Sequence, residues 1–102
     1  MTDVGQRLDL VPASEYLGRG AEFVRTVTRV LYRLMALGWL HADLEQGATR
    51  NVTWRAGAFY VIDFGKLVPY DFAQHGPRLS LGYARTHAEM AWEHVLRLAR
   101  RQ

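Results

Sequence analysis

The residues of this 102-residue chain that could do chemistry fall in three short stretches. They are His41 and Asp43 in the run LHADL, Asn51, and Asp63 in the run VIDFG. Carboxylate and amide oxygens are hard ligands of the kind that magnesium prefers, and a carboxylate can also accept a proton. Aspartate is common in turns, so a structural role for both aspartates is the alternative. The chain has no cysteine, which excludes a disulfide framework, a thiolate zinc site and a cysteine nucleophile.

A long helix is predicted before the first of these stretches. Apolar residues recur at helical spacing between residues 21 and 37, and Gly38 follows where a left-handed C-cap belongs. After Gly38 the helical period stops. Residues 39–50, which carry Asp43, are therefore predicted to form a loop rich in polar and small residues.

A β-hairpin is predicted directly after Asn51. Residues 52–54 and 59–62 are β-branched and aromatic runs, and the four residues 55–58 make a plausible turn between them. Adjacent runs joined by a short turn pair antiparallel. We expect this pairing to bring Asp63, which follows the second strand, close to Asp43.

The flanking segments add one more helix. Residues 1–19 are irregular in pattern, with a short helix start at residues 12–15. Residues 66–85 contain two prolines and two glycines and are predicted to be a long loop. Thr86 and Glu89 form a capping box, which predicts that the last helix begins there. The predicted fold class is α+β, in a single domain of residues 1–102.

The order of these motifs resembles the protein-kinase-like superfamily. In that family a helix ending at a glycine leads into His-x-Asp-Leu, an asparagine, a small hairpin and Asp-Phe-Gly. The resemblance covers about residues 20–66, and both the motifs and the elements between them match. It implies a partial protein-kinase-like C-lobe, with a long helix, a catalytic loop, a two-stranded hairpin and a C-terminal helix, and an ATP-dependent phosphotransferase function.

The resemblance also implies a role for each residue of the motifs. Asp43 would be the catalytic base that orients the attacking hydroxyl and accepts its proton. Asp63 and Asn51 would bind magnesium, so that Mg²⁺ and ATP are the implied cofactors. Three further residues would support the site structurally: His41, Phe64 and Gly65. Phe64 is expected to pack beneath His41, and Gly65 to let the chain turn sharply.

Several departures from the family pattern bear on activity. Seven residues separate Asp43 from Asn51, where the family usually has four, so residues 45–50 must bulge for Asn51 to reach the metal. Ala42 stands where the family has arginine or glycine. The only lysine is Lys66, and no glycine-rich loop covers the phosphates, so the nucleotide-binding residues are unknown. We therefore expect the isolated chain to be inactive, and a non-catalytic pseudokinase or binding module is the alternative function.

Charge suggests a third class of function. The net charge is +3, and Arg25, Arg29 and Arg33 form a stripe at four-residue spacing. Such a stripe is typical of a solvated helix face, but a basic interaction protein would also carry it. Nucleic acid is not expected as a partner, because no aromatic stacking motif accompanies the stripe.

The remaining expectations concern partners and location. The acceptor could be a protein or a small molecule. A truncated lobe should leave apolar faces uncovered on residues 23–34 or 88–98, so self-association or a partner that supplies the missing lobe is expected. Residues 1–10 contain acids and no apolar run, and no apolar segment approaches the length needed to span a bilayer. Secretion and membrane insertion are therefore not expected, and a cytoplasmic location is expected.

Overall fold

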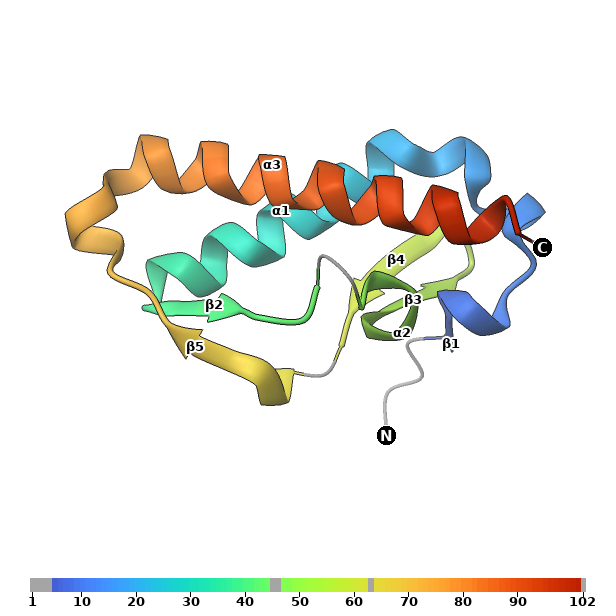
Figure 1. The fold of residues 1–102 in the computed structure, drawn as a ribbon, viewed down its shortest axis with the longest axis horizontal. Coiled ribbons are helices and arrows are strands. Elements are labelled where there is room, and N and C mark those ends of the chain that lie inside the picture. Colours follow the sequence, from blue (N-terminus) through green and yellow to red (C-terminus); the bar gives the residue numbers. More distant parts are fainter. Residues whose placement is uncertain (1–4, 45–46, 63, 102) are drawn as a thin grey trace.

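Two helices lie side by side and antiparallel, and two small sheets lie along one side of the pair (Figure 1). The computed structural model describes residues 5–44, 47–62 and 64–101. Helix α1 spans Gly20–Ala36 and helix α3 spans Phe72–Ala99. The sheets are antiparallel, one with three strands and one with two. The α+β class predicted from the sequence is confirmed.

Helix α1 confirms the prediction made from its apolar spacing. Its buried face consists of four residues at intervals of four: Phe23, Val27, Leu31 and Met35. The helix ends where Gly38 adopts a φ of +94°, the left-handed conformation expected of a C-cap glycine. The carbonyl of Gly38 then accepts a hydrogen bond from Tyr70 N–H at 2.9 Å, which ties this end of α1 to the start of α3.

Helix α3 begins fourteen residues earlier than the capping box predicted. The segment expected to be a long loop is helical from Phe72, and Asp71 caps it by accepting a hydrogen bond from Gln74 N–H at 2.9 Å. Gly76 has non-helical angles (φ 80°, ψ 164°), so α3 is two helical segments joined at a kink, with Pro77 at the start of the second. Proline is well tolerated at the first helical position. Thr86 therefore lies inside the helix, and the predicted start at Thr86 is wrong.

The predicted hairpin is confirmed. Strand β3, Val52–Arg55, pairs antiparallel with β4, Ala58–Val61. The turn is tighter than the four residues expected, because only Ala56 and Gly57 lie between the strands, with φ of 51° and 84°. Positive φ at both positions is the signature of a type I′ turn. Strand β1, Gln6–Arg7, which the sequence did not reveal, adds to the other edge of β3.

A second sheet corrects the prediction that residues 39–50 form a loop. Strand β2, Trp39–His41, pairs antiparallel with β5, Leu67–Pro69. A short helix, α2, spans Ala48–Asn51. Three-residue strands show no alternation, and their partner lies far along the chain. Local pattern therefore could not reveal them.

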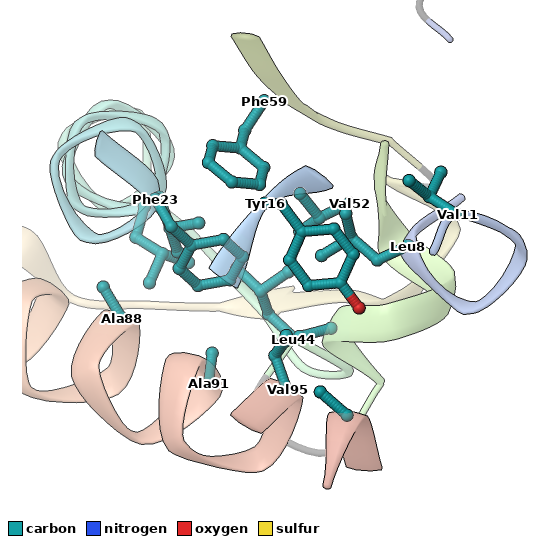
Figure 2. Close-up of a cluster of buried hydrophobic side chains, with 14 of the residues drawn as sticks. Leu8, Val11, Tyr16, Phe23, Leu44, Val52, Phe59, Ala88, Ala91 and Val95 are labelled. Atoms are coloured by element: carbon teal, nitrogen blue, oxygen red, sulfur yellow. The ribbon is translucent and has the colours of Figure 1, made fainter. Parts of the chain in front are cut away.

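The core lies between α1, the three-stranded sheet and α3. Figure 2 shows the rings of Phe23, Tyr16 and Phe59 gathered above the small side chains of α3. The Phe23 ring is 5.3 Å from that of Phe59 and 5.0 Å from that of Trp92, measured between centroids. Tyr16 comes from the N-terminal segment of 3₁₀ turns, one of which, Ala13–Glu15, occupies the helix start predicted at residues 12–15.

Small residues let α3 approach α1 closely. Its buried positions are almost all small: Ser80, Ala84, Ala88, Ala91, Val95 and Ala99. The apolar faces of residues 23–34 and 88–98 cover each other, so the prediction that they would be exposed is wrong. Exposed large apolar side chains on α3 include Leu79 and Leu81, and also Met90, which lies on the side of residues 88–98 that faces away from the core. No helix in the described part of the chain is both long enough and apolar enough to cross a membrane.

Candidate functional site

The candidate site centres on a direct contact between Asp43 and Asn51. The side-chain amide of Asn51 donates to the backbone carbonyl of Asp43 at 2.7 Å and to its carboxylate Oδ2 at 3.0 Å. Helix α2 ends at Asn51 and returns the chain to Asp43, so the longer, seven-residue spacing does not separate the two residues. The side chain of Asn51 is buried, so these bonds form away from bulk water. The two hydrogen bonds fix the Asp43 carboxylate and the backbone of the loop that carries it.

The same asparagine connects the site to the hairpin. The backbone carbonyl of Asn51 accepts a hydrogen bond from Ile62 N–H at 2.8 Å. Ile62 is the last residue before Asp63, which lies outside the described residues. The predicted approach of Asp63 to Asp43, and its role as a magnesium ligand, therefore stay predictions.

Gly47 is part of the site, although no motif in the sequence pointed to it. A Cβ atom at this position would lie 2.4 Å from the carbonyl oxygen of Asp43 and 2.8 Å from Nδ2 of Asn51. Contacts this short do not occur between ordinary side chains. Glycine is therefore required here by crowding. The sequence feature that could have pointed to Gly47 is that it is the only glycine between Asp43 and Asn51.

Lys66 is a second residue of the site that the sequence motifs did not assign to it. Its Nζ lies 3.4 Å from Oδ2 of Asp43, and its backbone carbonyl accepts a hydrogen bond from Ala42 N–H at 2.8 Å. The Lys66 side chain is 63% exposed, compared with 23% for Asp43. A pair this exposed contributes little to stability. Its main effect is to place a cation beside the carboxylate.

These neighbours keep Asp43 ionised. The hydrogen bond from Asn51 is the largest influence that lowers the pKa of the Asp43 carboxyl below its ordinary value. Partial burial acts in the opposite direction, and the hydrogen bond and charge of Lys66 lower the pKa further. Hydrogen bonds and cations favour the charged form of a carboxylate. Asp43 is therefore a carboxylate at neutral pH.

His41 and Phe64 pack together beside the loop. The expected contact between them is present, with ring centroids 5.9 Å apart in an edge-on arrangement. The buried ring of His41 accepts a hydrogen bond at Nδ1 from Asp43 N–H at 3.2 Å, which fixes the backbone next to the carboxylate. Its Nε2 is buried without a hydrogen-bond partner among the described residues. Gly65 lies in the 3₁₀ turn Phe64–Lys66, which leads into β5.

A cavity lies behind this loop, on the side of α3. Its volume is about 270 Å³, and its walls include His41, Tyr83 and His87. Neither Asp43 nor Asn51 lines it. A molecule bound in this cavity would not meet the carboxylate, so the cavity does not serve Asp43 as an acceptor site.

Magnesium is the metal ion that the kinase-like resemblance implies for this site. The amide nitrogen of Asn51 donates to Asp43, so a role for Asn51 as a metal ligand would fall to its side-chain oxygen. Magnesium keeps several waters and needs only one or two protein groups beside phosphate oxygens. Within the described residues no cluster of three or more acidic, histidine or cysteine ligands occurs. Asn51 would thus be a metal ligand with Asp63, which is not described.

Comparison with known proteins returned no match to a family model, a curated protein or a solved structure. The kinase-like resemblance therefore rests on the residues of the chain alone. It is carried forward as a proposal.

Proposed function

We propose that this chain supplies the catalytic-loop part of a protein-kinase-like, ATP-dependent phosphotransferase, with Asp43 as its general base. The observation that carries the proposal is the pair of hydrogen bonds from Asn51 to Asp43, at 2.7 and 3.0 Å. They join the two motifs across an insertion that could have separated them. A buried amide that holds both the carboxylate and the backbone carbonyl of one aspartate is typical of a site that must keep that carboxylate in a fixed orientation.

Each residue of the site has a defined task in this proposal. The acceptor hydroxyl donates a hydrogen bond to the Asp43 carboxylate, and its proton passes to that carboxylate as the hydroxyl oxygen attacks the γ-phosphorus of ATP. The bond between that phosphorus and the bridging oxygen breaks, and ADP leaves with the electron pair. Asn51 keeps the carboxylate turned toward the acceptor. The ammonium group of Lys66 lies 3.4 Å from Oδ2 of Asp43. In this position its positive charge would stabilise a phosphoryl group that approaches the carboxylate. Magnesium, when held by Asn51 and Asp63, would neutralise phosphate charge and align the nucleotide.

Turnover needs groups that this chain does not provide. The only lysine is Lys66, which pairs with Asp43, and the chain has no glycine-rich loop. Phosphoryl transfer depends mainly on positioning and charge stabilisation, so an unclamped triphosphate reacts slowly. We expect the 102-residue chain alone to transfer no phosphate, and to act together with a nucleotide-binding lobe.

One observation favours a non-catalytic binding module as the second candidate. The Lys66–Asp43 ion pair occupies the carboxylate that would accept the proton. A module of this kind would retain the folded loop without binding a metal ion. The two candidates therefore differ in metal binding at the loop.

Paramagnetic NMR distinguishes them without requiring turnover. Manganese(II) added to ¹⁵N-labelled protein should broaden the amide signals around Asp43 and Asn51, and Asp63→Asn should abolish the broadening. Asp9→Asn is the matched control, because Asp9 lies in an N-terminal turn and pairs with Arg7. Broadening that is absent from the loop, or equal in the two variants, would reject the phosphotransferase proposal in favour of the binding module.

A transfer assay tests the dependence on a second lobe. Radiolabelled ATP is supplied to the isolated chain with protein and small-molecule acceptors, and Asp43→Asn serves as the inactive control. We expect no transfer above that control. Transfer by the unsubstituted chain that disappears in Asp43→Asn would show that Lys66 or an arginine already positions the phosphates.

A further inference from the structure

Four arginines border a groove between helices α1 and α3, which Figure 1 shows side by side. The groove has a volume of about 670 Å³ and lies away from Asp43 and Asn51, neither of which lines it. The residues that line it include four exposed arginines, which we call its rim: Arg25, Arg29, Arg33 and Arg85. They also include three apolar or aromatic residues, which we call its floor: Val24, Tyr32 and Leu81. We call this feature the arginine groove.

The positive charge of the rim is largely uncompensated. Arg85 pairs with Glu89, but Arg25, Arg29 and Arg33 form no ion pair with any described residue. Like charges four residues apart destabilise a helix by about 0.2–0.5 kcal/mol per pair. Helix α1 carries two such pairs in succession. An anionic partner that lies along the helix would relieve this repulsion.

The floor of the groove is apolar. Leu81 is 51% exposed, and the side chains of Val24 and Tyr32 are half-buried between the rim arginines. The hydroxyl of Thr28, which also lines the groove, is buried with no hydrogen-bond partner among the described residues. The groove thus combines an apolar floor with a basic rim.

This combination selects among anionic partners. Nucleic acid presents mainly phosphates to a basic surface, and phosphates gain nothing from an apolar floor. Proteins that bind a membrane surface insert projecting apolar side chains into it, whereas the apolar side chains here line a groove. An amphipathic helix with acidic flanks satisfies both parts, because its apolar stripe fills the floor while its carboxylates meet the rim.

We propose that the arginine groove binds an acidic amphipathic helix of a partner protein. Arg25, Arg29 and Arg33 span nine residues of α1, about 12 Å between the first and the last. Glutamates repeated every four residues on the partner helix match this spacing. The groove does not use the carboxylate site, so this interaction holds whether or not the chain takes part in phosphoryl transfer.

The probe is a fluorescein-labelled synthetic helix of about 20 residues with a leucine stripe flanked by glutamates. Fluorescence anisotropy should show binding that weakens as salt rises from about 50 to about 200 mM. Arg29→Glu and Leu81→Asn should each weaken binding about tenfold or more. Arg97→Glu and Leu79→Asn are the matched controls, since both residues are exposed on α3 and outside the groove. Neither control should change the affinity more than about twofold.

Three comparisons could overturn the proposal. Equal losses in Arg29→Glu and Arg97→Glu would show attraction by net charge alone. Equal affinity for a peptide with glutamine in place of glutamate would show that the rim arginines do not contribute to binding. Tighter binding of a labelled DNA duplex, or of vesicles that contain phosphatidylserine, would assign the groove to nucleic acid or membrane instead. Circular dichroism of each variant confirms that its helices are intact.

Discussion

Gly47→Ala tests whether the candidate site depends on close packing around Asp43 and Asn51. A Cβ atom at residue 47 would lie 2.4 Å from the Asp43 carbonyl oxygen and 2.8 Å from Nδ2 of Asn51. The φ of Gly47 is −106°, which alanine adopts without strain, so the cost is steric. Because attractive contacts begin at about 3.5 Å, the Asp43 carbonyl must move by roughly 1 Å.

A movement of this size would break the hydrogen bonds from Asn51 to Asp43. They measure 2.7 and 3.0 Å, and an increase of about 1 Å takes them beyond hydrogen-bonding range. A buried donor left without an acceptor costs about 1–3 kcal/mol, and overpacking adds about 1–3 kcal/mol. Alanine recovers about 0.4–1 kcal/mol by restricting the unfolded chain. We expect the free energy of unfolding to fall by about 2–4 kcal/mol.

Urea unfolding followed by tryptophan fluorescence measures the loss. For a small domain it corresponds to a midpoint lower by about 1–2 M urea. Gly18→Ala is the control, because nothing lies within 4 Å of a Cβ atom at Gly18. Its effect should stay within about 1 kcal/mol of zero. If Gly47→Ala unfolds at the same urea concentration as Gly18→Ala, the reasoning from crowding is refuted.

Three further predictions concern the site and the core. The pKa of Asp43 lies below its ordinary value of 3.8, so its carboxylate stabilises the fold above that pH and loses this contribution as the pH falls below it. Asn51→Leu removes the largest cause of the lowered pKa and should flatten the acid limb of stability against pH; an unchanged limb in urea titrations would contradict this. Phe23→Ala should cost about 3–5 kcal/mol in thermal or urea unfolding, because the ring is fully buried; a smaller loss would mean that the core refills the space. Ala91→Leu should cost about 1–3 kcal/mol by overpacking α3 against its neighbours, whereas Met90→Leu, at an exposed position, should be close to neutral in the same assay.

Local pattern was enough for α1 and for the hairpin. The apolar period of α1 and the glycine at its end depend only on residues within one or two turns. The β-branched runs of β3 and β4 are joined by two residues, so their pairing is also local. Three motifs in a fixed order led to Asp43 and Asn51 by resemblance, and the structure places these two residues in contact.

Long-range packing decided the rest. Strands β2 and β5 are three residues each and form only because distant segments meet. In α3 the buried residues between Ser80 and Ala91 are serine and alanine, which give only a weak apolar signal, and their burial depends on how closely α1 approaches. The need for glycine at residue 47 likewise arises only once α2 brings Asn51 back against Asp43. Hydrophobic periodicity indicates the secondary structure of one segment. Strand pairing and steric crowding arise only when segments that are distant in the sequence come into contact.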